Sequence, residues 1–418
     1  MGKVNTADLE PGMCLADDVT ASSGRFLLPR GAVLEHKHLK ILQAWGITEA
    51  DIEGVSSEES AARRLADLDP HILQRAKDAT DPLFACCDTE SGPMKELYRL
   101  ALLRTARGLV SGLDAPKRPP SAAAPDEPPS PEPQEGISPF GLLEEEVELF
   151  SLPDIFYEIV DALNSPRSSA RFMAEVISKD TSLSAKLLRL VNSAFYGFQV
   201  PVSSISRAIA LIGTKELMTL AQGISLVRVF QDIPEELVSM RSFWMHSVAS
   251  GIYARFLSTQ QIGLSEEKFF VAGLIHDLGQ LVMFRKIPRL TRRITAASLQ
   301  RSTPLHGAEK EALGFDHSRI GGLLCREWKL PTFLEDAVHA HHEPAKRRYA
   351  LSACIIHLAD VMAHALSTGC SANLYVPDLD KEAWARLGHN PSILPLVAAQ
   401  ADRQISEVVS IFLNGEGA

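Results

Sequence analysis

The chain lacks the cysteine pattern of both the disulfide-rich and the zinc-ribbon classes of protein. Only six of its 418 residues are cysteine, and none of them forms a CxxC pair of the kind that holds zinc. Cysteines this sparse exclude a small secreted domain stapled by disulfides. We therefore expect reduced thiols and a cytoplasmic protein.

The chain also lacks an excess of basic charge and a long apolar run. It has 42 basic against 52 acidic residues, a formal net charge of −10. Non-specific binding to nucleic acid needs a basic surface that releases counterions, so no such binding is expected. No apolar run approaches the ~20 residues of a membrane span, and the N-terminus lacks the basic flank and apolar core of a signal peptide. We expect two or three soluble domains with no membrane partner.

Glycine-rich phosphate loops and β-α alternation are absent as well, which argues against Rossmann and P-loop nucleotide chemistry. What the chain does show is a change of pattern along its length. Residues 1–55 alternate short apolar stretches with turn signals and predict a small β-rich module. Residues 56–113 have helical periodicity and predict a connector of two or three helices. Residues 114–139 are rich in proline and predict an extended linker.

Residues 140–418 have helical periodicity almost throughout, so the fold is expected to be mainly α. Small polar side chains at the starts of these periodic segments can accept hydrogen bonds from the first free backbone amides. The expected capping residues are Ser168 or Ser169, Asp180, Ser203 or Ser204, and Thr214. The segments that follow them predict a helical bundle.

The stretch from Phe269 to Phe284 is an apolar run that contains one adjacent pair, His276 and Asp277. Its apolar residues cover all faces of a helix, so the run predicts a buried helix and places the pair in the interior. A buried carboxylate or imidazole costs several kcal/mol, roughly, unless it is paired or binds a metal ion. The rest of the chain should supply that partner.

Other histidines and one aspartate on helical segments are candidates for the partner. Neutral imidazoles combined with carboxylates suit a divalent transition metal such as Fe, Mn, Co or Zn better than Ca or Mg. The alternative is a buried hydrogen-bond network without metal. The candidate ligands are His246, His276, Asp277, His317, His341, His342 and Asp360.

The order H…HD…D formed by His246, His276-Asp277 and Asp360 resembles the HD superfamily of metal-dependent phosphohydrolases. The string Arg-Leu-Val-Asn-Ser-Ala-Phe-Tyr-Gly at residues 189–197 resembles the HDOD domain, an HD-related output domain of bacterial signalling proteins. The resemblance covers residues 140–418 and implies a helical first half, 140–235, and an HD-like second half, 236–418. The N-terminal residues resemble a small module that precedes some HD-type signalling domains.

The resemblance also extends to the related HD-GYP phosphodiesterases, which place additional metal ligands where this chain has His317, His341 and His342. It therefore implies one or even two ions. Those enzymes carry a lysine where this chain has Gln280, and the loss of that cation removes a group that could hold a phosphate. Their Gly-Tyr-Pro segment after His-His-Glu is absent too, since Glu343 is followed by Pro-Ala-Lys-Arg-Arg.

Two functions remain open at this point. The first is a signalling module that acts through an unidentified protein partner, with homo-oligomerisation possible, and that uses its metal to brace the fold or set its conformation. The second is a metal-dependent phosphohydrolase or phosphodiesterase acting on cyclic dinucleotides or nucleotide phosphates. Because the ligands are kept while the phosphate-handling residues are changed, the sequence favours the first, and it assigns no catalytic residue.

Overall fold

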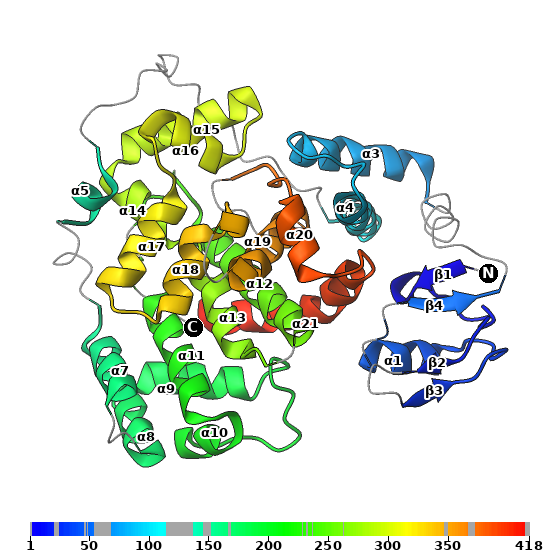
Figure 1. The fold of residues 1–418 in the computed structure, drawn as a ribbon, viewed down its shortest axis with the longest axis horizontal. Coiled ribbons are helices and arrows are strands. Elements are labelled where there is room, and N and C mark those ends of the chain that lie inside the picture. The colour runs from blue at the N-terminus through cyan, green and yellow to red at the C-terminus, as the bar shows by residue number, and fades with distance from the viewer. Residues whose placement is uncertain are drawn as a thin grey trace. The chain divides into compact units, whose positions relative to one another are not determined.

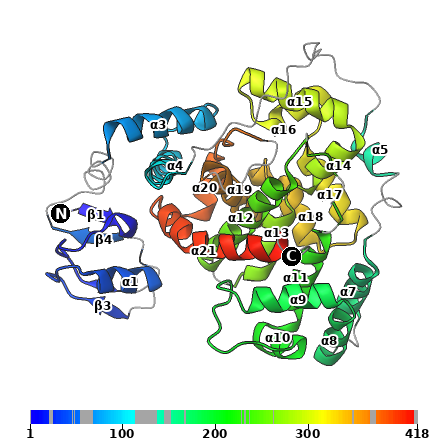
Figure 2. The ribbon, with the colours of Figure 1, turned by 180° about the vertical axis from the view of Figure 1, so that it is seen from behind.

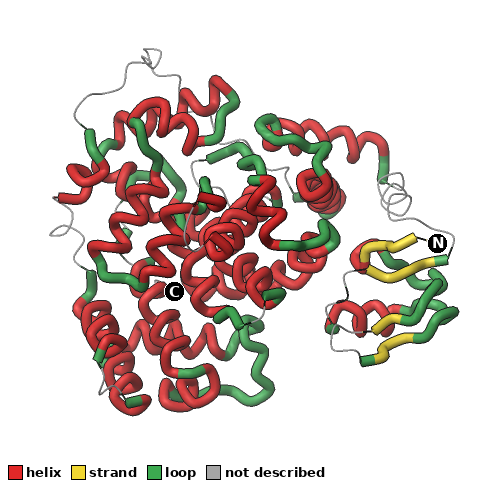
Figure 3. Tube along the Cα trace, viewed as in Figure 1, coloured by secondary structure: helices red, strands yellow, loops and turns green. Residues whose placement is uncertain are grey.

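The structure is a computed structural model that describes residues 2–20, 25–45, 47, 49–53, 68–113, 137–144, 152–165, 169–227, 229–230, 233–235, 237–261, 263–346, 350–366 and 373–413. The predicted proline-rich linker lies almost wholly outside these residues. The chain divides into two compact units, a smaller one with residues 1–84, 88–117 and 389–400 and a larger one with residues 85–87, 118–388 and 401–418. The mainly α fold with a small N-terminal β module is confirmed (Figures 1 and 3).

The N-terminal module contains two short antiparallel sheets. In one, β1 (Gly2–Asn5) pairs with β4 (Glu49–Ile52), and in the other β2 (Val19–Thr20) pairs with β3 (Phe26–Leu28). A single helix, α1 (His36–Ala44), accompanies them. The strands, α1 and the loops between them share one small apolar core. It consists of Val4, Leu9, Leu15, Val19, Leu28, Leu34, Leu42, Ala50 and Ile52.

Two helices of the predicted connector belong to the same unit. Asp69 caps α3 (Pro70–Thr80) by accepting from the amides of His71 and Ile72, and proline near the first turn fits there because it has no amide to satisfy. A short 3-10 turn, η2 (Asp81–Phe84), leads towards α4 (Gly92–Val110). α3 and α4 pack through Ala76, Leu102, Ala106 and Leu109.

The larger unit is built from helices packed around one extended apolar interior. Helices α7 to α11 form one end of the unit, and most of the rest consists of α12 to α20 (Figures 1 and 2). The remaining helices of the chain are α5 (Pro139–Glu144), α7 (Asp154–Asn164), α8 (Ala170–Ser178), α9 (Thr181–Val191), α10 (Ile205–Ile212), α11 (Thr214–Leu226), α12 (Met240–Thr259), α13 (Glu266–Ile275), α14 (Leu278–Lys286), α15 (Pro288–Arg301), α16 (Leu305–Leu313), α17 (His317–Glu327), α18 (Thr332–Ala340), α19 (Ala350–Ala365), α20 (Lys381–Leu387) and α21 (Ile393–Leu413), with the 3-10 turn η3 (Pro344–Lys346) before α19.

Three of the predicted helix caps are confirmed. Ser169, Asp180 and Ser204 accept hydrogen bonds from the third following amide of α8, α9 and α10. Thr214 as a cap is wrong, because α11 already begins at Thr214 and the capping position falls on Gly213, whose φ of 109° is open to glycine. Ser168 lies outside the described residues.

Residues 189–197 close the loop after α9 and connect the first half of the unit to the second through contacts with α12. The side chain of Asn192 accepts from the Val202 amide at 2.7 Å and donates to the Val202 carbonyl at 2.9 Å, which closes the loop after α9. Arg255 of α12 donates to the Phe195 carbonyl at 2.6 Å, and its guanidinium lies 4.0 Å from the centre of the Phe195 ring. The ion pair of Arg255 with Glu266 at 2.8 Å completes this junction.

The predicted single helix through Phe269–Phe284 is wrong in one respect, because the helix breaks at the His-Asp pair. α13 ends at Ile275, α14 begins at Leu278, and Asp277 has φ −96° and ψ 7°. Gly279 lies directly after the break, where α14 crosses α17 so closely that a Cβ would overlap the His317 carbonyl oxygen. The break turns both polar side chains of the pair towards the same interior point.

Among the described residues, no helix combines the length and the apolar character that crossing a membrane requires. The cysteines in this part of the chain, Cys14, Cys86, Cys87, Cys325 and Cys354, are free thiols.

Candidate metal centre

The structure brings all seven predicted ligand side chains together in the larger unit. They come from the middle of α12, the turn between α13 and α14, the first residue of α17, the end of α18 and the middle of α19. These elements are far apart in sequence, but α12 packs on both α13 and α19, and α17 packs on both α14 and α18. Helix packing therefore places the ligands, while metal binding itself stays a prediction.

A first group of side chains surrounds one oxygen of Asp277 and the carboxylate of Asp360. The Nε2 atom of His246 lies 3.1 Å from Asp360 Oδ1 and 3.8 Å from Asp277 Oδ2. The Nε2 atom of His276 lies 3.4 Å from each of the same two oxygens. Two imidazoles and two carboxylates thus converge on one point.

A second group faces the other oxygen of Asp277. The Nε2 atom of His317 lies 3.2 Å from Asp277 Oδ1, and that of His341 lies 3.8 Å from it. His342 Nε2 lies 2.9 Å from His317 Nε2. The Asp277 carboxylate therefore stands between two sets of imidazoles, with one oxygen turned to each.

Hydrogen bonds on the far side of three imidazoles fix which nitrogen points inward. The Nδ1 atoms of His276 and His341 lie 2.7 Å from the carbonyl oxygens of Gly273 and Val338, and His317 Nδ1 lies 2.6 Å from Glu309 Oε2. Because a carbonyl or carboxylate oxygen can only accept, we assign the proton to Nδ1 in each ring. Each Nε2 then turns a lone pair towards the carboxylates, as in the outer shells of metal-ligating histidines.

The inward lone pairs are the observation that tests whether a metal ion fits. His276 Nε2 and His341 Nε2 are buried and have no hydrogen-bond partner. Lone pairs facing carboxylate oxygens repel them unless a positive charge lies between, and that charge is either a proton or a metal ion. The residues present therefore fit one or two bound cations, with imidazole and carboxylate donors that suit a transition metal.

Water has little access to this charge cluster. His246, His276 and His341 are 0% exposed, Asp360 is 1% exposed and Asp277 is 2% exposed. Burial disfavours the charged form of His276, but the neighbouring Asp277 and Asp360 carboxylates outweigh it and raise the pKa of the imidazole to about 9. Burial likewise opposes ionisation of Asp277, yet His276 and His317 hold the pKa of its carboxyl below the usual range.

The pKa of His341 shifts in the opposite direction. Burial, together with the charges of His276 and His317, lowers the pKa of His341 to about 3. In the absence of metal, His341 is therefore neutral and His276 is protonated near neutral pH. A positive imidazole is expected next to carboxylates that are buried away from water.

The sequence interpretation missed three residues that contact the ligands. His364, one turn after Asp360 on α19, places Nε2 3.4 Å from Asp360 Oδ1 and joins His246 and Asp360 in a group with ligand spacing. Glu309 of α16 accepts from His317, and the ring of His306 stacks on His342. The spacing of Asp360 and His364 could have indicated the first, whereas the role of α16 depends on tertiary packing.

Gln280 occupies the place where the related phosphodiesterases carry lysine, and it points into the second group. Its side chain is 2% exposed, and its Nε2 lies 3.4 Å from His317 Nε2. A neutral amide thus takes the position where the resemblance to the HD-GYP enzymes implies a lysine.

Comparison with known proteins agrees with this architecture. The family model of the HDOD domain matches residues 149–344. A protein of Treponema pallidum (strain Nichols) that has not been characterised is 27% identical over 233 residues, which are 55% of this chain and 42% of that protein. The chain therefore matches less than half the length of this curated relative.

Three solved structures of bacterial proteins show a similar fold. An HDOD domain protein of unknown function from Geobacter sulfurreducens superposes with a TM-score of 0.51 at 22% identity, covering 65% of this chain and 96% of its own. A proposed phosphohydrolase from Shewanella amazonensis SB2B gives 0.52 at 24%, covering 65% and 98%. A proposed signal transduction protein from Marinobacter aquaeolei VT8 gives 0.51 at 21%, covering 65% and 61%. At these identities the likeness shows a common fold.

Proposed function

Residues 149–344 of this chain belong to the HDOD family, and we propose that the protein is a cytoplasmic signalling protein whose HDOD domain holds one or two divalent transition-metal ions and acts through contact with a partner protein. The single observation that supports metal binding is the position of Asp277. Its two carboxylate oxygens face two groups of imidazoles, and each group has one buried Nε2 atom without a hydrogen-bond partner, that of His276 in the first and that of His341 in the second.

Two ligand sets follow from this arrangement. The residues that would hold a first ion are His246, His276, Asp277 and Asp360, with His364 beside them. The residues that would hold a second ion are Asp277, His317, His341 and His342. A bound transition metal supplies a compact positive charge that acts as a Lewis acid.

The closed interior favours a structural or conformational role for the metal. Structural sites surround their ion with protein ligands, whereas catalytic sites keep a position open for water or substrate. Here the side chains of both aspartates and of His246, His276, His317 and His341 are at most 3% exposed, and among the seven ligands only His342 is partly exposed. A metal that joins α12, α14, α17, α18 and α19 would couple their positions, which is the property that a relay between input and partner needs.

The alternative is a metal-dependent phosphohydrolase, and the shared Asp277 carboxylate is the observation that favours it. Two ions held close together stabilise both the attacking and the leaving oxygens of phosphoryl transfer. Gln280 weighs against this function, because the neutral amide leaves the second group without the cation that would hold a substrate phosphate.

One experiment separates the two functions. The full chain is purified, loaded with Mn²⁺, Fe²⁺ or Zn²⁺, and incubated with bis(p-nitrophenyl) phosphate and with a cyclic dinucleotide, with Asp277→Ala as the control. The signalling proposal predicts bound metal and no turnover above the control. Turnover that Asp277→Ala abolishes would establish the hydrolase instead, and a wild-type protein that takes up no metal would contradict both.

A further inference from the structure

The helix α16 is bound to its neighbour α15 through a small apolar cluster of its own. Ile294 of α15 and Leu305 and Ala308 of α16 form the buried part of this cluster, and Leu290, Ala312 and Leu313 pack against it. α15 and α16 therefore form a helical hairpin whose two apolar faces pack against each other. The polar side chains of α16 remain available for the metal centre.

Glu309 of α16 is buried and accepts two hydrogen bonds from one ligand of the second group, His317. It is 1% exposed, and its Oε2 accepts from His317 Nδ1 at 2.6 Å and from the His317 backbone amide at 2.9 Å. One carboxylate thus fixes both the ring and the backbone of His317. Because His317 Nδ1–H donates to Glu309, the other ring nitrogen of His317, Nε2, faces Asp277.

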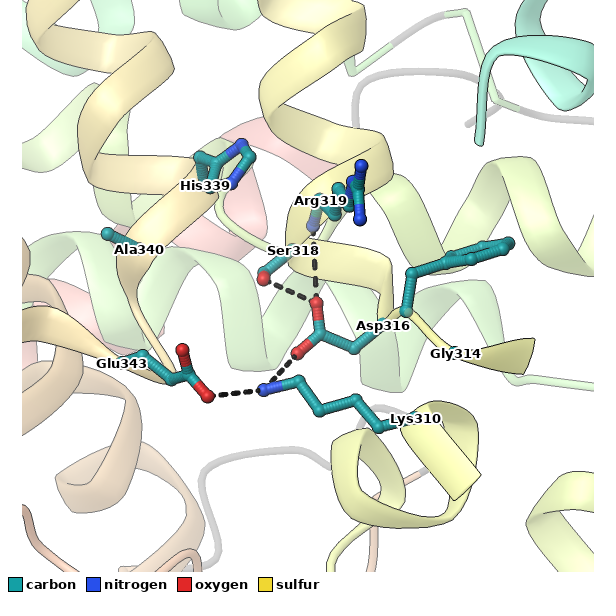
Figure 4. Close-up of a pocket in the computed structure, with 9 residues that line it drawn as sticks. Lys310, Gly314, Asp316, Ser318, Arg319, His339, Ala340 and Glu343 are labelled. Atoms are coloured by element: carbon teal, nitrogen blue, oxygen red, sulfur yellow. Dashed lines mark hydrogen bonds and ion pairs between the residues drawn. The ribbon is translucent and has the colours of Figure 1, made fainter. Parts of the chain in front are cut away.

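Lys310, the next residue of α16, ties together the two segments that carry the second group (Figure 4). Its ammonium lies 3.1 Å from Asp316 Oδ2 and 3.0 Å from Glu343 Oε1. Asp316 directly precedes His317 and caps α17 through the Arg319 amide, while Glu343 directly follows His342. The lysine therefore bridges the start of α17 and the segment that follows α18.

This lysine can be reached from outside, unlike the buried ligands His317 and His341. The Lys310 side chain is 38% exposed and lines a pocket of 430 Å³ together with Asp316, Arg319, His339 and Glu343. A third contact lies deeper, where the ring of His306 stacks on that of His342 with centroids 4.1 Å apart. α16 thus touches His317, His342 and the residues beside them.

We propose that α16 controls the second ion, with Glu309 and Lys310 as positioning residues that orient His317 and hold the His341-His342 segment against it. This inference rests on the proposed metal-binding function and names its regulation. The first group takes its contacts from α12, from the turn after α13 and from α19, so it is independent of α16. A displacement of α16 releases the second ion and leaves the first in place.

Stepwise metal titration of the full chain tests this inference. Metal-free protein is titrated with Zn²⁺ by calorimetry, and the bound metal is counted by elemental analysis. Loss of an outer-shell partner typically weakens metal binding by about 10- to 100-fold. Glu309→Ala should therefore weaken the second step by that factor and leave the first within about twofold. Lys310→Met removes partly exposed ion pairs to the residues beside the ligands and should weaken the second step by up to about fivefold.

Glu311→Ala is the matched control. Glu311 lies on the same helix but pairs with Arg301 at 2.6 Å, away from the ligands, so both steps should match those of the wild type. Lys310→Met keeps the test valid if Glu309→Ala fails to fold, because Lys310 is partly exposed. Co²⁺ absorption spectra give a second readout, in which Glu309→Ala should lose the bands of the second ion and retain those of the first.

The possible outcomes separate this inference from the proposed function. Two ions in the wild type, with an unchanged second step in both variants, would overturn the control by α16 and leave metal binding intact. A wild type that binds only one ion would also overturn it. A wild type that binds none would overturn the proposed metal centre as well.

Discussion

Replacement of Gly279 by alanine should disturb the fold and the metal centre through one added methyl group. Gly279 is the second residue of α14, at the point where this helix crosses α17. A Cβ at this position would overlap the carbonyl oxygen of His317 and lie 2.8 Å from the amide nitrogen of Gly321. Both neighbours are backbone atoms, so no side-chain rotation relieves the overlap.

The size of the effect follows from this geometry. A carbon and a carbonyl oxygen normally approach no closer than about 3.3 Å, so the two helices must separate by roughly 1 Å or more. Overpacking of this kind costs about 3 kcal/mol, and the better helix propensity of alanine returns about 1 kcal/mol. We expect a net loss of about 2 kcal/mol in the free energy of unfolding. The same displacement moves His317 away from Asp277.

Denaturant unfolding monitored by circular dichroism measures the stability, and Zn²⁺ titration measures the second ion. Gly108→Ala is the control, because a Cβ at this position in α4 has its nearest neighbour at 3.9 Å. That variant should gain up to about 1 kcal/mol. A Gly279→Ala protein with wild-type stability and wild-type metal uptake would refute the close crossing of α14 and α17 and its role in placing His317.

Other expected outcomes concern the ligands, their titration and the loop after α9. Asp277→Asn should lose both ions, whereas His341→Ala should lose only the second, as counted by elemental analysis; equal losses in the two variants would contradict the shared role of Asp277. Metal affinity should rise with pH up to about 9, where the His276 pKa lies, because protons compete for its Nε2, and titrations between pH 6 and 9 measure this. In metal-free protein, the raised pKa means that protonated His276 stabilises the fold. This contribution is complete below the ordinary pKa of 6.5 and is lost as the pH rises through about 9. The difference in the free energy of unfolding between wild type and His276→Gln should therefore shrink over that pH range. Asn192→Ala should lower the free energy of unfolding by about 1 kcal/mol, because it removes two partly buried hydrogen bonds to the backbone of Val202, and an unchanged unfolding midpoint would contradict that role.

Several helix starts could be predicted from local sequence, but features that depend on how the helices pack could not. Ser169, Asp180 and Ser204 could be predicted as caps because a side-chain oxygen before a periodic segment satisfies the first amides. The break between α13 and α14 could not be predicted, because apolar residues continue on both sides of His276 and Asp277 without a proline. The close approach of α17 at Gly279 became visible only in three dimensions.

For the candidate ligands, too, the sequence predicted the residues but not their arrangement. Motif order and chemistry selected seven side chains, and the structure brings them together around Asp277. The division of that carboxylate between two groups could not be read from the sequence, because it depends on which side of α14 each neighbouring helix packs. Glu309 was missed for the same reason, since an acidic residue eight positions before His317 has no recognisable spacing.

Anomalous diffraction from crystals of metal-loaded protein would show whether cations lie on both sides of the Asp277 carboxylate. Data collected above and below the absorption edge of the loaded metal locate its ions. We expect a peak among His246, His276, Asp277 and Asp360 and, in fully loaded protein, another beside His317 and His341. Crystals grown with saturating metal that show no anomalous peak next to either oxygen of Asp277 would contradict the proposed metal centre.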